Sequence, residues 1–512
     1  MRIAMHGPPL CRITAPGVLE MASDVGKVTA DSRRVEPRDL FVALPGQHTH
    51  GIRFVGEAIR RGAAGVVLPE DAPVPAGVER WIRTSQPRLL YAHLAHAAYG
   101  HPSRQLKVVA VTGTNGKTTT VEWAAQLLNR AGIKARTIGT LTPYAETRGL
   151  TTPVAEDVAR LMHRAAAEGA AVVLVEASSH ALVQHRLAGV QLSLAAVTSL
   201  GRDHLDFHRR LAAYWAAKRR LVKQPLSAWF LAPREGVLLP SSQEPPWTGF
   251  AAHVCTRLVR FGPQGQVRIR PLGLSLQGLQ AEVEIQSLKR RLRLPLLSDT
   301  ALPSLEAAVA LTWMLGVEPR QLMALLPHLD PVPGREEWYL VPGGPWVVVD
   351  YAHNPQALEH LLAGIRRLLP KSRLTTVFGG RGHRDRGKLP LMGEVASRYA
   401  QRVVVTTDSP YDEDPYELAQ AILSRAPFGE WIEDRQSAIL SAVWRSRAGD
   451  VVVVTGRGHE TDQYGPKGRL NTGSDGEWLL SVLGARRYRP RQGSTVPRWK
   501  AWTLPARLGE GQ

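Results

Sequence analysis

The chain has 512 residues, too many for one hydrophobic core, so we expect two to four domains. Its composition (44% hydrophobic, 21% charged, two cysteines, no long apolar run, no apolar signal-peptide core) indicates a globular enzyme of the reducing cytoplasm, and argues against a disulfide scaffold, a cysteine-based zinc site or a membrane span. The formal net charge of +19 favours anionic ligands, but no nucleic-acid-binding motif accompanies it, so we expect no specific nucleic-acid partner.

The first block, residues 1–104, alternates between strand and helix patterns. Residues 39–44 and 65–68 are apolar runs typical of buried strands, and residues 54–61 and 89–99 have helical spacing. We therefore expect a small N-terminal α/β domain.

The second block, residues 105–332, begins with a strand pattern at 108–111, a glycine turn and a helical pattern that starts at Lys117. Backbone N–H groups at a helix start point at an anion, and the helix dipole favours negative charge there. We therefore predict a phosphate-binding loop, in which Lys117 reaches the outer phosphates of ATP and the Thr118 hydroxyl binds Mg2+. The predicted loop residues are Gly113, Thr114, Asn115, Gly116, Lys117, Thr118 and Thr119.

Two later strand patterns of this block lead into polar residues. Residues 171–175 end at Glu176, and the next strand pattern is followed shortly by His204. In a doubly wound sheet, ligands bind beyond the carboxyl ends of the strands, so we expect Glu176 and His204 at the same edge as the phosphate loop. A helical pattern over residues 211–221 then carries Lys218.

The remainder of the chain completes the predicted fold. Residues 225–295 have weak periodicity, which predicts short strands and loops. Strand and helix patterns alternate over residues 333–488, which predicts a second parallel sheet. Residues 489–512 form a basic, proline-rich tail, and we expect the chain to fray from about residue 486. We thus predict an α/β protein of three domains: an N-terminal substrate domain (1–104), a central P-loop parallel sheet (105–332) and a C-terminal Rossmann-like domain (333–488).

Short motifs follow one another in a fixed order along the chain. They are Asp31-Ser-Arg33, the phosphate loop, Leu150-Thr-Thr-Pro153, the stretch from Ser178 to Arg186, Arg202-Asp-His-Leu-Asp206, Tyr214 with Lys218, Asp350-Tyr-Ala-His-Asn-Pro355, Arg384-Asp-Arg-Gly-Lys388 and Gly456-Arg-Gly-His-Glu460. Each motif alone is a weak signal, but the ordered set resembles the Mur ligase family. These are ATP-dependent amide ligases that extend the peptide of the bacterial cell-wall precursor, and the set is most similar to the branch that adds the third amino acid.

The resemblance implies an activity and its catalytic residues. A cytoplasmic monomer would join an amino acid to UDP-N-acetylmuramoyl-L-Ala-D-Glu through an acyl phosphate, using ATP and Mg2+. Lys117 would act on the phosphates, and Glu176 and His204 would bind Mg2+ together with Thr118. Lys218 would be carbamylated, which converts a cation into an anionic metal bridge. Without the resemblance, Lys218 would be interpreted as a solvated helix lysine and His204 as a structural histidine.

The resemblance also implies the substrate-binding residues. For the nucleotide-sugar peptide they are Ser32, Gln47, His48, Thr49, Thr151, Thr152, Ser178, Gln184 and Arg186. Arg335 and Asp350 would lie near the ATP phosphates and ribose. For the incoming amino acid the residues are Arg384, Asp408, Ser409, Pro410, Tyr411, Gly456 and Glu460, with Arg384 pairing the α-carboxylate.

The sequence departs from the family pattern at two functional positions. Residues 298–304 lack the asparagine that holds adenine in relatives, and Tyr411 replaces the arginine that grips the distal carboxylate of diaminopimelate. A phenol offers one neutral hydrogen bond in place of a charged fork. The acidic residues 412–414 would repel a second carboxylate and attract an ammonium if they face the pocket, and otherwise they form a solvated loop. We therefore expect L-lysine or another residue without a distal carboxylate to be preferred over meso-diaminopimelate, unless Arg381 or Arg386 replaces the lost contact from another direction.

Other functions are compatible with part of the pattern. A folylpolyglutamate synthetase-like ligase would share the phosphate loop and metal ligands, but not the Asp31-Ser-Arg33 block. A noncatalytic paralogue that binds the nucleotide sugar would explain the missing asparagine, but not the retained Lys117, Glu176, His204 and Lys218. A P-loop motor or switch would need a partner motif that the chain does not have.

Overall fold

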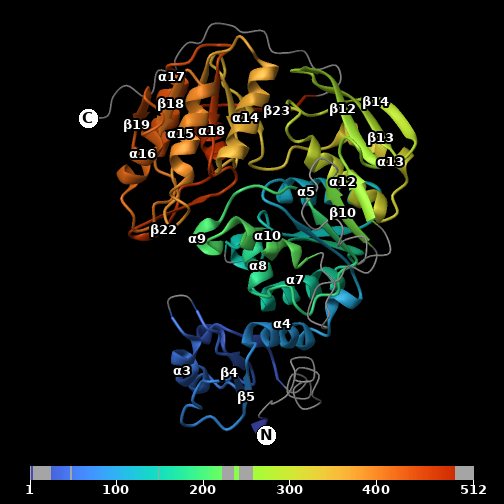
Figure 1. Ribbon diagram of the computed structural model, residues 1–512, viewed down its shortest axis with the longest axis vertical. Coiled ribbons are helices and arrows are strands. Elements are labelled where there is room, and N and C mark those ends of the chain that lie inside the picture. The colour runs from blue at the N-terminus through green and yellow to red at the C-terminus, as the bar shows by residue number, and fades with distance from the viewer. Residues whose placement is uncertain are drawn as a thin grey trace. The chain divides into compact units, whose positions relative to one another are not determined.

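The computed structural model describes residues 2–3, 25–46, 49–147, 149–221, 236–240 and 258–490. The chain divides into two compact units. The first comprises residues 1–200, 212–265 and 307–317, and the second comprises residues 201–211, 266–306 and 318–512. Figure 1 labels many of the elements of both units.

The first unit begins with a five-stranded parallel sheet in the order β1-β5-β4-β3-β2. Side chains alternate across β3, so Leu40 and Val42 pack toward α4 while Phe41 packs toward α3. The predicted alternation of strands and helices is therefore observed in this region, within the first unit. Its elements are β1 (Arg2–Ile3), β2 (Val28–Thr29), β3 (Leu40–Val42), α3 (Val55–Arg60), β4 (Gly65–Pro69), β5 (Trp81–Thr84) and α4 (Pro87–Ala98).

The same unit contains a larger parallel sheet in the order β11-β10-β9-β6-β8-β7. Strand β6 lies inside this sheet, and its residues after Lys107 are all buried, as expected of an apolar run covered on both faces. The predicted phosphate loop follows β6 directly. The elements are β6 (Lys107–Thr112), α5 (Lys117–Arg130), β7 (Ala135–Ile138), α6 (Tyr144–Thr147), α7 (Ala155–Ala167), β8 (Val172–Glu176), α8 (Ser179–Val183), β9 (Leu194–Val197), α10 (Leu211–Arg219), β10 (Gly236–Pro240) and β11 (Leu258–Phe261).

The second unit begins with long antiparallel strands that the weak periodicity of residues 225–295 did not predict. Strands β12 (Val267–Ser275), β13 (Gly278–Ile285) and β14 (Leu288–Leu294) pair in sequence order. Both turns between them are short, and β14 carries basic residues on an exposed face, which weakens the apolar alternation. The second unit also contains α9 (Leu205–His208), α13 (Pro319–Leu325) and the 3-10 turn η4 (Leu326–His328). Helix α12 (Leu302–Met314) begins in this unit, and its residues from Ala307 on belong to the first unit.

The rest of the second unit is a seven-stranded sheet in the order β19-β18-β17-β20-β16-β15-β23, parallel from β19 to β16. One face packs against α14, α15 and α16 and the other against α17 and α18, so the predicted Rossmann-like layering is observed (Figure 1). The elements are β15 (Glu337–Leu340), β16 (Trp346–Val349), α14 (Pro355–Leu368), β17 (Leu374–Phe378), α15 (Lys388–Tyr399), β18 (Arg402–Val405), α16 (Pro415–Leu423), β19 (Gly429–Trp431), α17 (Arg435–Trp444), β20 (Val451–Val454), β21 (Asp462–Gly465), β22 (Gly468–Asn471), α18 (Asp475–Val482) and β23 (Arg486–Tyr488).

The chain end begins later than expected. Residues 486–488, predicted to fray, form β23, which pairs antiparallel with β15, and the Tyr488 hydroxyl donates to the Leu276 carbonyl at 2.7 Å. Residues 491–512 lie outside the described residues. Within the described part of the chain, no helix has the length and apolar character needed to cross a membrane.

Candidate active site

The loop between β6 and α5 has the backbone geometry of an anion-binding turn. Gly113 has φ of 154°, and a Cβ atom there would lie 1.9 Å from the Thr198 hydroxyl, so only glycine fits. Gly116 precedes the helix in the left-handed region at φ of 87°. The N-terminal N–H groups of the 14-residue helix α5 therefore open at the carboxyl end of a buried strand.

Side chains from the loop itself and from the residues after β9 hold this turn. The Lys117 ammonium donates to the carbonyls of Gly113 at 2.9 Å and Thr114 at 3.1 Å, so it lies folded over the loop. The Asn115 carbonyl accepts from the hydroxyls of Thr198 at 2.6 Å and Ser199 at 3.0 Å. The loop is thus fixed before any nucleotide binds.

Glu176 meets the phosphate loop at the end of the neighbouring strand β8, as expected from the strand order. Its carboxylate accepts from the Thr118 hydroxyl at 2.9 Å and from the Thr140 backbone N–H at 2.7 Å. Glu176 is buried, which keeps these oxygens out of bulk water. A hydroxyl and a carboxylate, both hard oxygen donors, therefore lie together at the start of α5.

Lys218 is not the solvated helix lysine that its position alone would suggest. It is 1% exposed, and its ammonium donates to the Gly113 carbonyl at 2.7 Å and lies 4.4 Å from the centre of the Tyr214 ring. The Tyr214 hydroxyl in turn donates to Thr114 at 3.1 Å. Helix α10 thus delivers Lys218 to the phosphate loop across about a hundred residues of sequence.

His204 lies in the second unit, so the residues predicted to bind the metal belong to both units. It is within ionic range of Asp203 at 3.8 Å, and Asp203 also faces His353 at 3.8 Å and Lys388 at 4.0 Å. Burial opposes ionisation of Asp203, but the charges of His204, Lys388 and His353 hold its pKa below the ordinary value. Among the described residues, no three His, Cys, Asp or Glu side chains gather as metal ligands.

Residues predicted for the nucleotide-sugar peptide cluster at the end of β8. The Thr152 hydroxyl donates to the Glu176 carbonyl at 2.7 Å and accepts from the Ser178 backbone N–H at 2.9 Å. Arg186 donates to the Thr152 carbonyl at 2.6 Å and grips the Gln184 side chain with two hydrogen bonds, of 2.8 and 3.1 Å. Four predicted residues thus form one bonded group, and Thr151 is their half-buried chain neighbour.

The residues predicted for uridine lie in the N-terminal sheet region. Ser32 is buried and donates to the Glu57 carboxylate at 2.7 Å, and Thr49 is exposed. Gln47 and His48 lie outside the described residues. The hydrogen bond from Ser32 gives it a structural contact in addition to any role with a ligand.

In the second unit, the residues predicted for ATP are Arg335, in the turn before β15, and Asp350, directly after β16. The Arg335 guanidinium stacks 4.1 Å from the Tyr351 ring centre, and Asp350 accepts from the backbone N–H groups of Glu336 at 2.7 Å and Ala352 at 2.6 Å. Burial raises the pKa of Asp350, and Arg335 acts in the opposite direction.

The stretch without the family asparagine contains an unexpected buried contact. The Ser298 hydroxyl donates to Glu336 at 2.5 Å and lies 2.8 Å from the Thr300 hydroxyl. Burial raises the pKa of Glu336 to about 7, with Ser298 acting in the opposite direction. A buried carboxyl group and two hydroxyls therefore lie together in this part of the second unit.

Glu460 carries the amino-acid part of the predicted site. Its carboxylate accepts from Arg381 at 3.0 and 3.2 Å and from the Tyr351 hydroxyl at 2.9 Å. Arg381 also reaches the Tyr411 hydroxyl at 3.5 Å. By contrast Arg384 is exposed, and its described charge neighbour is Asp206. Asp408, Ser409 and Pro410 are buried beside this group along the chain.

The acidic run after Tyr411 does not supply free charge to this site. Asp412 pairs with His383, and Glu413 pairs with Arg386 and the His383 backbone N–H. Asp414 caps α16 by accepting from the Tyr416 N–H at 2.8 Å. Each acid of this run thus has a partner within the protein, and the prediction that the run repels a second carboxylate stays a prediction.

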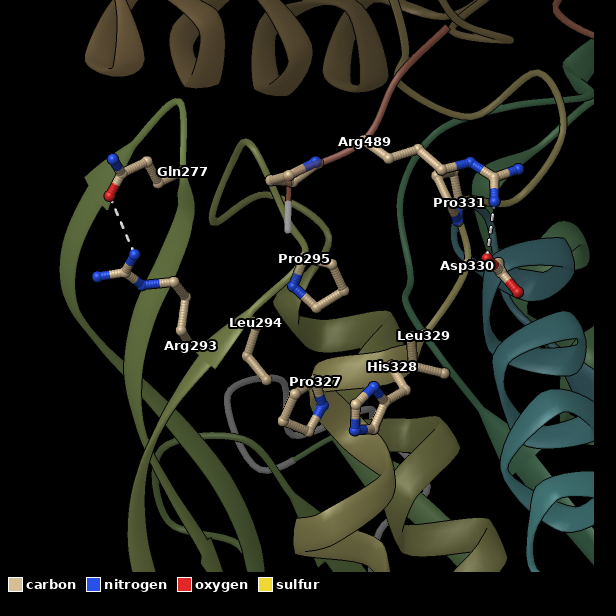
Figure 2. Close-up of a pocket in the computed structure, with 11 residues that line it drawn as sticks. Gln277, Arg293, Leu294, Pro295, Pro327, His328, Leu329, Asp330, Pro331 and Arg489 are labelled. Carbon is tan, nitrogen blue, oxygen red and sulfur yellow. Dashed lines mark hydrogen bonds and ion pairs between the residues drawn. The ribbon is translucent and has the colours of Figure 1, made fainter. Parts of the chain in front are cut away.

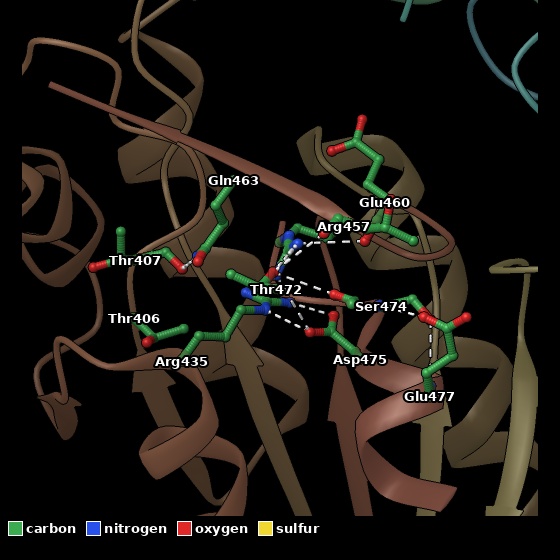
Figure 3. A network of polar contacts seen from close by, with 12 residues as sticks. Thr406, Thr407, Arg435, Arg457, Glu460, Gln463, Thr472, Ser474, Asp475 and Glu477 are labelled. Atoms are coloured by element: carbon green, nitrogen blue, oxygen red, sulfur yellow. Dashed lines mark hydrogen bonds and ion pairs between the residues drawn. The ribbon is translucent and has the colours of Figure 1, made fainter. Parts of the chain in front are cut away.

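A buried network supports the loop that carries Gly456 and Glu460 (Figure 3). Arg435 forms a two-bond ion pair with Asp475 at 2.8 Å, and both side chains are 3% exposed. Arg457 donates to the Thr472 hydroxyl at 2.8 Å and to the Glu460 carbonyl at 3.3 Å. Helices α17 and α18 and the loop after β20 are thereby joined without solvent.

A separate cavity of about 410 Å3 lies between β14, η4 and the chain after β23 (Figure 2). An ion pair of 2.9 Å between Arg489 and Asp330, and a hydrogen bond of 3.0 Å between Arg293 and Gln277, lie along its wall. None of the residues predicted for the active site lines this cavity.

Sequence reasoning assigned no definite role to Arg381, Tyr351 and Arg435. Arg381 stands in the glycine loop after β17, and Arg435 begins α17, so neither forms a local pattern with a partner. Their place in the sequence could have marked Arg381 and Tyr351 as site residues, because both follow the carboxyl ends of parallel strands, where ligands bind. Their partners are distant in sequence and appear only on folding.

Three family models match successive parts of the chain. They are described as the Mur ligase family catalytic domain at residues 24–110, the Mur ligase middle domain at residues 111–244, and the Mur ligase glutamate ligase domain at residues 334–458.

Individual relatives match over nearly the full chain. The UDP-N-acetylmuramoyl-L-alanyl-D-glutamate–2,6-diaminopimelate ligase of Alkalilimnicola ehrlichii is 40% identical over 486 residues, covering 90% of this chain and 95% of the relative. A solved structure of a ligase with that name matches at 28% identity with a TM-score of 0.60, covering 90% of this chain and 95% of the other. The MurF ligase of Thermotoga maritima in complex with ADP shares the fold at 19% identity, with a TM-score of 0.61 and coverage of 86% and 94%. The extent and identity of these matches, together with the phosphate loop, show that the chain belongs to the Mur ligase family.

Proposed function

We propose that this protein is a UDP-N-acetylmuramoyl-tripeptide synthetase, which uses ATP to join 2,6-diaminopimelate to UDP-N-acetylmuramoyl-L-Ala-D-Glu in peptidoglycan precursor synthesis. The observation that carries the proposal is the phosphate loop with Glu176 and Lys218 bonded to it. The name of the 40% identical relative supplies the substrates.

The chemistry explains why the site needs these groups. A carboxylate is a poor acyl donor, so transfer of the ATP γ-phosphoryl group to it creates an acyl phosphate. The amine of the incoming amino acid attacks that carbonyl, and inorganic phosphate leaves. Lys117 and the N–H groups at the start of α5 stabilise the charge on the transferring phosphoryl group, because they are cationic or dipolar and fixed in advance.

The oxygen donors at this loop fit Mg2+. Thr118 and Glu176 present a hydroxyl and a carboxylate within 2.9 Å of each other, which is the ligand type that magnesium prefers. In this proposal Thr118, Glu176, His204 and carbamylated Lys218 hold the metal. Bound Mg2+ neutralises phosphate charge during transfer.

Lys218 supports the carbamate through its burial. An ammonium with 1% exposure beside a phosphate site would oppose a bound cation, whereas a carbamate is anionic and offers two oxygens. The short contact to the Gly113 carbonyl and the adjacent Tyr214 ring leave the nitrogen at the loop itself.

The remaining substrate contacts are proposed from the motifs that the chain shares with the family. Ser32, Gln47, His48 and Thr49 hold the uridine end, and the bonded group of Thr152, Ser178, Gln184 and Arg186, with Thr151, holds the peptide end. In the second unit Arg335 and Asp350 serve ATP. Arg384, Asp408, Ser409, Pro410, Tyr411, Gly456 and Glu460 serve the amino acid.

We assign diaminopimelate to the amino-acid site, which reverses the expectation of L-lysine. That expectation rested on Tyr411 and on the acidic residues 412–414. The acids are paired elsewhere, and the guanidinium of Arg381 reaches the Tyr411 hydroxyl. A positive charge is therefore retained where the family arginine is lost.

Purified protein with ATP, Mg2+ and the nucleotide dipeptide tests the proposal. Addition of meso-diaminopimelate should release phosphate and give a product with the mass of the nucleotide tripeptide. If no amino acid gives phosphate release while calorimetry shows that the nucleotide dipeptide binds, the noncatalytic paralogue is favoured. Turnover of a folate substrate in place of the nucleotide dipeptide would favour the folylpolyglutamate synthetase-like alternative.

A further inference from the structure

We propose that Arg381 binds the distal carboxylate of the incoming amino acid, with Glu460 and Tyr411 holding its guanidinium in place. The inference rests on the proposed ligase function. It names a specificity-determining residue that comes from a different loop than the arginine of related enzymes.

The guanidinium of Arg381 is held on two sides and keeps donor capacity that these contacts do not use. One terminal nitrogen donates to both oxygens of Glu460, at 3.0 and 3.2 Å, and the other lies 3.5 Å from the Tyr411 hydroxyl, at the limit of a hydrogen bond. Its Nε is buried and has no hydrogen-bond partner among the described residues. The side chain as a whole is 22% exposed, and a guanidinium has five N–H donors, more than these contacts occupy.

Tyr411 is held so that its hydroxyl stays at Arg381. The ring stacks between His383, at 5.2 Å and 12°, and Tyr464, at 5.4 Å and 13°. The Tyr411 backbone N–H donates to the Tyr464 carbonyl at 2.9 Å, and its φ of 59° lies in the left-handed region, which aromatic residues rarely adopt. Tyr411 therefore acts as a fixed support for the guanidinium.

Other buried polar atoms around this group also lack protein partners. Asp408 Oδ1, Arg457 Nε and Arg435 Nη1 are buried without a hydrogen bond within the described residues, and Asp408 is 2% exposed. Buried polar groups are rarely left unpaired, so a polar ligand or ordered water is required here. Asp408 and Glu460 both act on the charge of Arg381, which places these groups within electrostatic range of one another.

The two neighbouring arginines are used differently. Arg386 is exposed and pairs with Glu413 and, at 3.6 Å, with Glu417, neither of which is proposed to contact the amino acid. Arg384 is exposed, and in the proposed function it takes the α-carboxylate. Arg381 is the arginine of this loop whose guanidinium contacts two residues proposed for the amino acid, Glu460 and Tyr411.

The pair of Arg381 and Glu460 matches a zwitterion. Diaminopimelate carries an ammonium and a carboxylate at the end remote from the reacting amine, and the ion pair offers a guanidinium and a carboxylate side by side. Lysine offers an ammonium alone at that end. Arg381 therefore distinguishes the two amino acids, while Glu460 serves both.

The test compares kcat/KM for meso-diaminopimelate and L-lysine in the full-length enzyme. Loss of a charged hydrogen bond reduces binding by about tenfold or more, so Arg381→Ala should lower kcat/KM for diaminopimelate at least tenfold, mainly through KM. The value for lysine should change much less, so the ratio of the two falls. Arg381→Lys, which keeps the charge but loses the planar fork, should give an intermediate ratio.

Two further variants complete the experiment. Arg386→Ala is the matched control on the same loop, and its ratio should equal that of the wild type. Tyr411→Phe should lower the ratio only a few-fold, because the guanidinium keeps its contact with Glu460.

The outcomes separate the two proposals. Failure of the wild type to release phosphate with either amino acid overturns the proposed function. An active wild type in which Arg381→Ala and Arg381→Lys lower both amino acids equally overturns the role of Arg381 alone. Melting curves for each variant identify misfolding, and in that case the folded Arg381→Lys protein decides the question.

Discussion

The phosphate loop and the amino-acid site are built in opposite ways. The loop presents backbone N–H groups fixed by glycine geometry and by bonds to carbonyl oxygens, and its residues are contiguous in sequence. The proposed amino-acid site presents side chains from separate strand ends, held by ion pairs such as that of Arg381 with Glu460 across 79 residues. Backbone recognition tolerates few changes of conformation, whereas side-chain recognition allows an arginine to move between loops.

The largest effect on activity is expected at the phosphate loop. Lys117→Ala should abolish phosphate release, because no other loop side chain supplies the cation that crosses the turn. Binding of the UDP-sugar should persist, since its predicted contacts lie elsewhere. Phosphate release and calorimetry measure the two effects, with the exposed Lys134→Ala as control. Loss of UDP-sugar binding in the Lys117 variant would contradict the assignment of the two sites to different regions.

The next largest effect is expected at Lys218. Lys218→Ala should reduce kcat by orders of magnitude, because the anionic bridge to the metal is lost. Short carboxylic acids added to the assay should restore part of the activity by occupying the gap left at Gly113. Wild-type turnover in the alanine variant would show that no carbamate is needed.

A smaller effect, on folding stability, is expected in the buried network that supports the loop with Gly456 and Glu460. Arg435→Ala leaves Asp475 as a buried charge without its main partner, which should cost about 3–5 kcal/mol of folding free energy. Asp475→Asn in the same chain should recover part of that loss, because the uncompensated charge is removed. Urea unfolding measures both variants, with Arg445→Ala, 66% exposed on the same helix segment, as control. Equal stability of Arg435→Ala and Arg445→Ala would contradict the network.

The smallest effect is a pH-dependent change in folding stability at Glu306, which lies outside both sites. Burial raises the pKa of Glu306 to about 7 from 4.5, while its carboxylate accepts from the Ile269 N–H at 2.7 Å. Between these values the folded chain keeps a proton that the unfolded chain has lost, so stability falls as pH rises from 4.5 to 7 and then stays lower.

Glu306→Gln keeps the acceptor and removes the ionisation. The variant should be more stable than the wild type by at most about 3.5 kcal/mol at pH 8, using about 1.4 kcal/mol per pKa unit, with no gain at pH 4. Denaturant unfolding at several pH values measures the difference, and activity serves as the control. Parallel stability profiles for the two proteins would show that Glu306 ionises normally.

Prediction from sequence succeeded where a pattern was local. The apolar runs at 108–111 and 451–454 are parallel strands inside their sheets, and the turn at 113–116 opens a helix, because sterics and burial act within a few residues. It did not identify the partners of residues 412–414, which are His383, Arg386 and a backbone N–H at the start of α16. It also missed the length of β12 to β14, whose exposed basic face hides the alternation.

The phosphate loop, most of the strands and helices, and the family motifs were predictable from the sequence, because each depends on neighbours along the chain. The burial of Lys218 at the Gly113 carbonyl and the contact of Arg381 with Tyr411 became visible in the folded structure. Burial and ion pairing depend on side chains that come from distant strands, so the local spacing of residues does not predict which charged groups will be neighbours in the folded chain.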